Sequence, residues 1–488
     1  MLFGNFIWLV ITLMRKRFIS FITYIGYCWS FVYNRIKRWQ TAVSATMDLY
    51  SLEKFKTYKS DWNYPIQIRY QQQEASTKKT KSPVTFQAAI KETLIVGQCF
   101  GLVPVLGVGD EDTSKLRFKF LSWRCAYTIV SIISQIAMTI LLLFSAFKYT
   151  SSSVETAIDL IFYSLAFTTT ILFLRVAMNW PKLCTQISKM EAADPNTDTK
   201  LKRKFNVTLI VILFLAFLEH MLSEVQTVSL ALDCEPDSPI YESSVKHRFT
   251  WLYAFLPYNN FIGFLTHFIN IQCTFNWNFS DLFVICMSIY VTSRLEQVNQ
   301  RVLAAKDKNS PSSFWRTVRE DYNRSVHLVR LVDNTIGGIV FISFASNLFF
   351  ICSQLLHTFA GGLSATPRCR PQPSADPRLF HGYENSVYFA YSFVFLVARA
   401  LVVSLTAAKV HAASLEPAYS LYDVSSATFC VEIERFLDQI HGDTVALSGL
   451  QFFNVKRGLI LTIAGTIVTY ELVLLQFAGV SQVTPEPV

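Results

Sequence analysis

The sequence predicts an all-α membrane protein with seven transmembrane helices. Hydrophobic residues make up 51% of the 488 residues, charged residues make up only 16%, and the mean hydropathy is positive. Seven apolar runs are near or above the roughly 20 residues that an α-helix needs to cross a bilayer. Lys and Arg are concentrated in alternate segments between these runs, which is typical of a multi-pass protein.

The apolar runs begin about a quarter of the way along the chain and continue almost to its end. They cover residues 121–147, 157–178, 205–230, 251–291, 336–359, 387–408 and 459–477. The fourth run is too long for one simple crossing. It contains either two spans or one helix that continues beyond the membrane as an amphipathic extension.

The distribution of positive charge decides between these alternatives. Lys and Arg gather in residues 15–119, 182–204, 294–330 and 409–457. With seven spans, all four segments fall on one side of the membrane, which the positive-inside rule assigns to the cytoplasm. We therefore expect a cytoplasmic N-terminus and an extracellular C-terminus. The pI of about 8.9 then reflects loops that face anionic lipid, and no nucleic-acid partner is expected.

Residues 1–85 are expected to form a cytoplasmic N-terminal region. Its apolar segment 1–32 is atypical, because Arg15-Lys16-Arg17 follows the apolar stretch, whereas a signal peptide carries its charges in front. An interfacial anchor, a hairpin and a wrongly assigned coding segment all stay open as explanations.

The rest of the chain divides at the predicted spans. The segments are 86–280 (a pre-span segment and four spans), 281–335 (cytoplasmic helices), 336–411 (two spans), 412–458 (a second cytoplasmic segment), 459–477 (the last span) and 478–488 (an extracellular tail). The two cytoplasmic segments mix apolar and charged residues at helical spacing, which predicts a packed helical anchor. Residues 365–377 contain four prolines and are expected to form an extracellular loop.

Polar side chains recur along one face of the last span. Thr462, Thr466, Thr469 and Gln476, with Val473 between them, are spaced so that one helical face carries them all. A single Thr in a membrane helix often bonds back to the carbonyl four residues earlier and has no further role. A whole stripe that ends in Gln favours a helix that lines a pore.

Cysteines and histidines give no metal signature. The ten cysteines are scattered without the short spacings of metal sites. Only Cys234 and Cys369 fall in predicted extracellular loops, where one disulfide is possible. The eight histidines show no ligand-like pairing, and His220 is expected to hydrogen-bond a neighbouring acid. We therefore expect no metal. We also expect no cofactor and no enzymatic activity.

Short motifs between residues 88 and 477 form a recognisable set. They are Gln98-Cys99-Phe100-Gly101-Leu102-Val103-Pro104-Val105, Leu116-Arg117-Phe118, Trp277-Asn278-Phe279-Ser280-Asp281-Leu282-Phe283, Glu320-Asp321-Tyr322-Asn323, Asn347-Leu348-Phe349-Phe350-Ile351-Cys352, Phe453, Arg457-Gly458-Leu459 and Ala464 to Phe477. The chain resembles the insect gustatory receptors in these segments. The ending Thr469-Tyr470-x5-Gln476-Phe477 is similar to the family signature. Glu471 and the Gly-Leu-Val-Pro block resemble the sugar-receptor branch.

The resemblance implies a fold and a function. A chain of this kind is expected to be a seven-helix subunit of a tetrameric, non-selective cation channel in the plasma membrane that a sugar opens directly. The implied partners are a mono- or disaccharide, further copies of the chain or related subunits, membrane lipid and permeant cations. Gln476 and Phe477 would form the gate near the outer mouth of the pore, where an apolar ring can dewet the pathway.

A sugar pocket needs aromatic faces and side chains that both donate and accept hydrogen bonds. Its candidates lie in the outer parts of the first six spans: Asp159, Glu219, His220, Glu224, Trp251, Tyr258, Asn347, Gln354, Tyr388 and Tyr391. An interfacial position in the membrane is the alternative for each aromatic residue. Arg399, well inside the sixth span, is expected to pair with a carboxylate.

Two other classes of membrane protein are alternatives to a ligand-gated channel. A G-protein-coupled receptor shares seven spans, but the third span lacks an Asp/Glu-Arg-Tyr ending, the seventh lacks Asn-Pro-x-x-Tyr, and the basic loops lie on the wrong side. Glycan at the sequons of Asn206 or Asn323 would favour that class, because those residues would then face outside. A transporter would show inverted repeats and broken helices, and the sequence has neither.

Overall fold

The computed structural model describes residues 85–480, apart from 111, 149–153, 194–197, 236–237, 362–382 and 427. These residues belong to one compact unit, Pro83–Val488. The apolar segment 1–32, the proline-rich stretch 365–377 and residues 481–488 of the tail lie outside the described residues. The elements, in chain order, are α2 (Phe86–Cys99), β1 (Val105–Leu106), η1 (Thr113–Lys115), β2 (Arg117–Phe118), α3 (Trp123–Lys148), α4 (Val154–Ala193), α5 (Leu201–Cys234), α6 (Ile240–Arg248), α7 (Thr250–Tyr253), α8 (Asn260–Ala305), α9 (Ser312–Gly361), α10 (Glu384–Tyr422), α11 (Val431–Gly442), β3 (Ser448–Gly449), β4 (Phe453–Asn454) and α12 (Arg457–Val480).

Each predicted span lies within one helix, except the first and the fourth, which begin before α3 and α8. Five helices among the described residues are long and apolar enough to cross a membrane: Trp123–Lys148, Thr156–Ala192, Leu201–Leu232, Ser312–Leu356 and Glu384–Tyr422. Arg457–Tyr470 of α12 forms a shorter apolar helix. The structure is therefore a helical membrane protein, and the count of seven spans stays a prediction.

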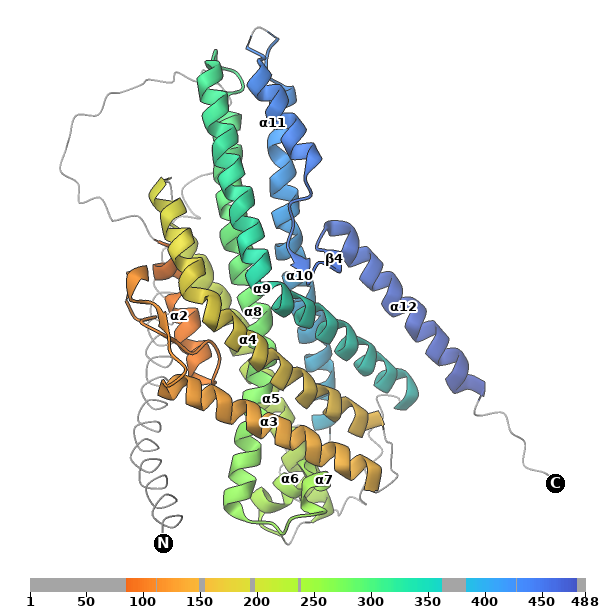
Figure 1. Ribbon diagram of the computed structural model, residues 1–488. Coiled ribbons are helices and arrows are strands. Elements are labelled where there is room, and N and C mark those ends of the chain that lie inside the picture. Colours follow the sequence, from red (N-terminus) through yellow and green to blue (C-terminus); the bar gives the residue numbers. More distant parts are fainter. Residues whose placement is uncertain are drawn as a thin grey trace, which may run out of the picture. The chain divides into compact units, whose positions relative to one another are not determined.

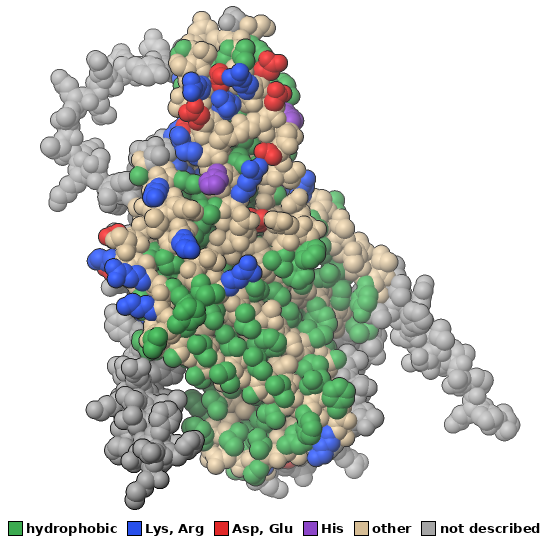
Figure 2. Space-filling model, in the orientation of Figure 1, with side chains coloured by type: hydrophobic (Ala, Val, Ile, Leu, Met, Phe, Trp, Pro, Cys, Tyr) green, Lys and Arg blue, Asp and Glu red, His purple; other side chains and the backbone are tan. Residues whose placement is uncertain are grey.

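The surface separates into an apolar and a charged region. Figure 2 shows hydrophobic side chains over the lower half of the visible face, and Lys, Arg, Asp and Glu gathered above them. Large apolar side chains are exposed on several of the spans, among them Ile133 and Phe144 on α3 and Phe214 on α5. A soluble protein rarely exposes so much contiguous apolar surface, so lipid is the expected solvent of this region.

The fourth predicted span is one continuous helix, but it begins later than expected. α8 runs for 46 residues from Asn260. Trp251 lies on the separate short helix α7, and Tyr258 lies in the connection between α7 and α8, so neither residue belongs to the span. The Asn259 side chain accepts a hydrogen bond from the Phe261 amide and thereby caps α8 at this point.

α8 is the central helix of the unit (Figure 1). It packs against α4, α5, α9 and α10, and its residues are almost all buried from Phe275 to Leu295. Polar side chains such as Asn276, Asn278 and Asp281 occupy this buried stretch. A helix surrounded by other helices can carry such groups only where they are hydrogen-bonded, which explains why the most buried span is not among the most apolar ones.

The motif between Gly97 and Val105 ends α2 and fixes the following chain against α8. A Cβ atom at Gly97 would lie 2.6 Å from the Phe279 ring, so only glycine fits there. Gly101 has φ +79°, which reverses the chain after the helix. The Gln98 amide then donates to the carbonyls of Val103 (3.0 Å) and Val105 (2.7 Å). The motif is therefore a rigid structural joint.

Beyond the apolar region, the ends of α8, α9 and α10 continue together, and α11 packs on α9 and α10 (Figure 1). Asn299 of α8 donates to the Ala413 carbonyl at 3.0 Å, and Tyr322 of α9 donates to the Ser414 carbonyl at 3.0 Å. Arg319 binds Glu432 at 2.9 Å and lowers the pKa of that carboxyl, so α11 is attached by a charged pair at neutral pH. The predicted amphipathic segments thus form one packed region.

A hairpin of β3 and β4 leads into α12. Ser448 donates to Asp333 of α9 through its amide (2.6 Å) and its hydroxyl (2.7 Å). Gly449 faces the Phe453 ring, which leaves no space for a Cβ atom. These contacts determine where the last helix begins.

Cys234, at the end of α5, is disulfide-bonded. Seven other cysteines of the described residues are not part of a disulfide. The partner of Cys234 lies outside the described residues, so the pairing with Cys369 stays a prediction.

Candidate functional site

A chain of hydrogen bonds joins α5, α10 and α9 inside the bundle. Ser392 of α10 donates to Glu219 Oε1 at 2.6 Å, and Gln354 of α9 donates to the Ser392 hydroxyl at 3.0 Å. The second oxygen of Glu219 and the carbonyl oxygen of Gln354 are buried and make no hydrogen bond within the described residues. Buried acceptors normally have a partner, so this chain has unused capacity for a water molecule or a ligand hydroxyl.

Two of the predicted tyrosines flank this chain. Tyr388 lies one turn before Ser392 and is in hydrogen-bonding reach of Ser223 and Ser392. Tyr391 donates to the Leu215 carbonyl at 3.0 Å and ties α10 to α5. Four predicted residues, Glu219, Gln354, Tyr388 and Tyr391, are therefore gathered on three helices around Ser392. We call Glu219, Gln354, Tyr388, Tyr391 and Ser392 the inner polar cluster.

Asn347 does not join the inner polar cluster. Its amide donates to Asp281 Oδ2 at 3.1 Å, and its carbonyl oxygen accepts from Arg399 at 3.4 Å. It belongs to a second buried network, in which Asp281 is the central acid. Asp281 lies in one of the sequence motifs, which alone assign it no role. Because Asp281 and Arg399 already hydrogen-bond both ends of the Asn347 amide, the geometry does not support Asn347 as part of a sugar pocket.

The second network is built around Arg399 and Asp281. The Arg399 Nε atom lies 2.8 Å from Asp281 Oδ2, and both side chains are almost fully buried. Asp281 also accepts from Ser343, and Arg399 donates to Asn278. The guanidinium lies 4.2 Å from the centre of the Trp277 ring. The carboxylate partner predicted for Arg399 is therefore Asp281.

A sequence signal for this pair existed. Asp281 and Arg399 are acid and base within otherwise apolar or uncharged helical stretches, and such charges in a membrane bundle normally face its interior and pair. Spacing alone could not select Asp281, since Glu219 and Glu224 were equally eligible.

A small cavity lies between α4, α8 and α9. It is lined mostly by apolar side chains, among them Cys273, Trp277 and Phe350, and by the polar side chains of Thr169 and Ser346. Its free space corresponds to about one water molecule. No sugar fits this space, so a sugar would require these helices to move apart or would bind beside the inner polar cluster.

The aromatic candidates at the ends of the helices form an apolar layer. Trp251 packs edge to face on Tyr163 with a centroid distance of 6.2 Å. Tyr258 packs on Tyr253 at 5.5 Å, and the hydroxyls of both tyrosines are buried without a hydrogen-bond partner in the described part of the chain. Asp159 is half-buried on α4, one turn before Tyr163. None of these three candidates contacts the inner polar cluster in a described interaction.

His220 and Glu224 face a different group of residues. Glu224 Oε1 lies 3.6 Å from His220 Nε2 and 3.2 Å from Arg248 of α6. His267 of α8 approaches the same two side chains. The expectation that His220 hydrogen-bonds a neighbouring acid is wrong, because Glu224 lies beside it but their separation of 3.6 Å is too long for a hydrogen bond. The expectation that no histidines pair is wrong, because α5 and α8 lie side by side and bring together side chains that are far apart in sequence.

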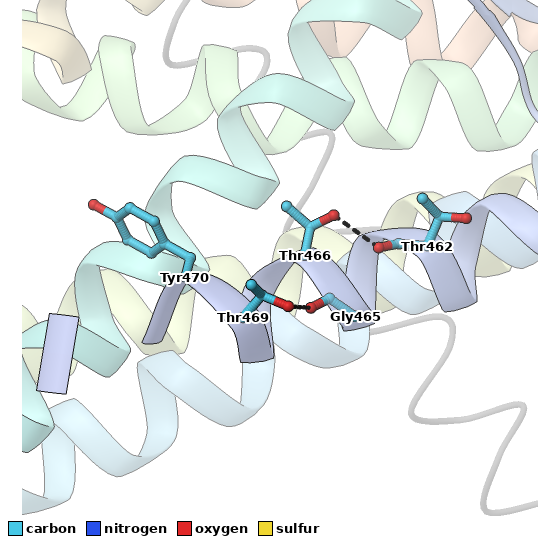
Figure 3. A pocket seen from close by; sticks show the side chains of 5 residues that line it. All are labelled: Thr462, Gly465, Thr466, Thr469 and Tyr470. Atoms are coloured by element: carbon cyan, nitrogen blue, oxygen red, sulfur yellow. Dashed lines mark hydrogen bonds between the residues drawn. The ribbon is translucent and has the colours of Figure 1, made fainter. Parts of the chain in front are cut away.

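The threonine stripe of α12 lies on an open surface. Thr462, Thr466 and Thr469 are exposed, and with Gly465 and Tyr470 they line one shallow depression (Figure 3). The hydroxyls of Thr466 and Thr469 donate to the carbonyls of Thr462 (2.9 Å) and Gly465 (2.8 Å). Each of these hydroxyls thus uses its proton on a backbone carbonyl of the same helix. The hydroxyl oxygen can still accept a hydrogen bond on the open side.

The adjacent face of α12 is the one that packs. Leu459, Ile463 and Ile467 contact the apolar core. The helix therefore has a buried side and an unpartnered side within one chain. The side chains of Val473, Gln476 and Phe477 lie outside the described residues, so their assignment to the pore and gate stays a prediction.

The chain was compared with protein families and with curated proteins. The sequence model of the trehalose receptor family matches residues 68–370 and 374–485. The gustatory receptor for sugar taste 64f of Drosophila melanogaster is 30% identical over 433 residues, covering 87% of this chain and 88% of that protein. The gustatory receptor 5a for trehalose of the same fly is 31% identical over 418 residues, covering 84% and 89%.

Solved structures give the fold. The insect olfactory receptor OR5 from Machilis hrabei, in complex with eugenol, superposes with a TM-score of 0.55 at 14% identity, covering 80% of this chain and 97% of that chain. The same receptor in a second structure gives a TM-score of 0.54 at 15% identity, with the same coverage. At this identity the similarity concerns the fold alone.

Proposed function

Because the chain belongs to the trehalose receptor family, we propose that it is a sugar-opened cation channel subunit of the plasma membrane. The observation that carries this proposal is the open polar face of α12. α12 is an apolar helix with three exposed threonines on one face. Such a face is better solvated by water than by lipid. Further copies of the chain, or related subunits, would enclose this face as a central pore.

The inner polar cluster is the proposed sugar site. A sugar ring carries several hydroxyls that donate and accept, and it is recognised by convergent polar groups beside aromatic rings. Glu219 and Gln354 supply unused buried acceptors, and Tyr388 and Tyr391 supply aromatic faces next to them. Because the three helices of the cluster also contact the rest of the bundle, a sugar that spreads or draws them together would act on the remaining helices.

The gate is proposed at Gln476 and Phe477, near the end of α12. Four apolar rings would dewet a closed pore, and four amide groups would meet a hydrated cation when it opens. We expect the Phe477→Ala channel to conduct without sugar. Four alanine side chains around the pore would leave a wider constriction than four phenylalanines, and water would fill it. Whole-cell current in sugar-free solution measures this. A closed-state current equal to that of the unchanged protein would exclude Phe477 as the gate.

The proposal is tested by whole-cell recording from cells that express this chain alone, with trehalose first in a panel of mono- and disaccharides. We expect an inward cation current that depends on sugar concentration. A sugar response that requires GTP and is abolished by blocking G proteins would favour the G-protein-coupled class instead. Sugar uptake into vesicles without current would favour a transporter. No response alone, but a response with a related subunit, would indicate a heteromer.

A further inference from the structure

α5 and α8 bring three metal-ligating side chains together. His220 and Glu224 lie one turn apart on α5, and His267 lies two turns into α8. The ligand atoms of all three residues lie within 4.8 Å of one another. In the described part of the chain, no other group of three or more His, Cys, Asp or Glu side chains meets this condition. The three residues are half-buried, so an ion could reach them.

The separations fit a shared ion better than a hydrogen bond. His220 Nε2 is buried without a hydrogen-bond partner, and its distance of 3.6 Å to Glu224 Oε1 is too long for one. Two ligands that each lie about 2.0 to 2.1 Å from a tetrahedral zinc ion are separated by roughly 3.3 Å. A small side-chain adjustment therefore brings this pair into coordination distance.

The donor types select the class of ion. Two imidazoles and one carboxylate form a mixed nitrogen and oxygen set that Zn²⁺ and similar transition ions bind, with a fourth position left for water. Ca²⁺ and Mg²⁺ require oxygen ligands and are disfavoured. The carboxylate of Glu224 also compensates part of the charge of the ion.

Arg248 both supports and weakens such a site. Its guanidinium binds Glu224 Oε1 at 3.2 Å and Thr227 Oγ1 at 2.6 Å. The hydrogen bond to Thr227 holds the guanidinium in place, and the ion pair with Glu224 helps to orient the carboxylate. The positive charge also repels a cation, so we expect moderate affinity rather than the tight binding of a structural zinc site.

We propose that His220, Glu224 and His267 bind a Zn²⁺-type ion that links α5 to α8. The inference rests on the geometry of these side chains and goes beyond sugar sensing. It also removes His220 and Glu224 from the sugar pocket. A bound ion would couple two helices that otherwise meet through side-chain packing.

The test is cobalt binding to the purified full-length protein after chelator treatment. Tetrahedral Co²⁺ absorbs strongly in visible light when histidine and carboxylate hold it, and Zn²⁺ then displaces it. We expect the unchanged protein to develop this absorption at one ion per chain. His267→Gln should lower the affinity for Zn²⁺ by about 100-fold or more. Loss of a residue that only supports a ligand costs about 10- to 100-fold, and loss of a direct ligand should cost at least as much.

Two controls keep the test decisive. His441→Gln removes a histidine of α11 that is not part of the cluster and should leave the cobalt spectrum unchanged. Size-exclusion elution and thermal unfolding without metal establish that His267→Gln is folded. If the unchanged protein gives no tetrahedral spectrum, or if the spectrum survives in both His220→Gln and His267→Gln, the site is overturned and the cluster is an ion pair only.

Discussion

Glu219 and Gln354, which both hydrogen-bond Ser392, each keep one buried oxygen without a hydrogen-bond partner among the described residues. A buried polar atom without a partner costs about 1–3 kcal/mol, and the structure has two such oxygens on neighbouring side chains. Arg399, Asp281 and Asn347, by contrast, bind one another through an ion pair and hydrogen bonds. The first group is therefore suited to bind a ligand and the second to hold helices together.

We expect Glu219→Gln to lower sugar sensitivity without loss of surface expression. Glutamine keeps the shape and can still accept from Ser392, but it replaces a charged acceptor by an amide. Hydrogen bonds to charged groups contribute about 1.5–3 kcal/mol, so the half-maximal sugar concentration should rise roughly 10- to 100-fold. Dose-response currents and surface labelling measure the two quantities.

Glu296→Gln is the matched control, since Glu296 is an acid of α8 that pairs with Lys409 at 2.6 Å, outside the inner polar cluster. It should leave the dose-response curve in place. A normal curve for Glu219→Gln would remove Glu219 from the sugar site.

We expect Asp281→Asn to lower the apparent melting temperature strongly. The substitution leaves the Arg399 charge buried without its anion, and breaking a buried pair costs about 3–5 kcal/mol. Thermal unfolding of the purified protein at a fixed heating rate measures the change. Asp281→Asn with Arg399→Gln should recover part of the loss, because no charge then remains buried.

Arg435→Gln provides the comparison for Asp281→Asn. Arg435 pairs with Glu432 at 3.0 Å, but its side chain is 63% exposed, and exposed pairs contribute only about 0–1 kcal/mol. Equal melting temperatures for Asp281→Asn and the unchanged protein would show that the buried pair does not hold α8 to α10.

At the scale of elements, α12 has one side that packs on the bundle and one side that carries threonines and has no partner among the described residues. Leu459, Ile463 and Ile467 attach it to the bundle, whereas the threonines of the adjacent side point into open space. Single-chain stability does not require those threonines. Their polarity is explained by a surface that meets water or another subunit.

Cysteine labelling distinguishes the two sides of α12. We expect a charged methanethiosulfonate reagent to reduce the sugar-evoked current of Thr466→Cys, because an exposed position on the pore side is reachable from water. Ile463→Cys should be unaffected, since Ile463 packs against the core. Recording before and after reagent, with the unchanged protein as background, measures this. Equal modification of both variants would contradict the assignment of the threonine side to the pore.

At the scale of the whole molecule, the sequence predicted the helices better than their contacts. Apolar length located every predicted span on a helix, because the bilayer imposes a minimum length on each crossing. It misplaced the start of α8, where the Asn259 cap outweighs the apolar character of Trp251 and Tyr253. Periodicity identified polar residues that face the interior, but it carries no information on which helix they meet.

The candidate site illustrates the same limit. Residue type and depth predict Glu219, Gln354, Tyr388 and Tyr391, and the structure gathers these four. The same criteria predict Asn347, which belongs with Asp281 and Arg399. They do not predict His267, because only the packing of α5 on α8 reveals its proximity to His220.

The orientation of the molecule gives the last prediction. All four Lys- and Arg-rich segments fall on one side if the fourth apolar run is a single crossing, and the positive-inside rule then places residues 1–85 in the cytoplasm. A seventh crossing by α12 places the C-terminus outside. An epitope at the C-terminus should therefore bind antibody on intact cells. An epitope at the N-terminus, or one inserted at the exposed Lys308 between α8 and α9, should bind only after permeabilisation. A G-protein-coupled receptor would give the reverse pattern at both termini. If both termini are labelled on the same side, the number of crossings is even, and α12 cannot then both span the membrane and follow six other spans.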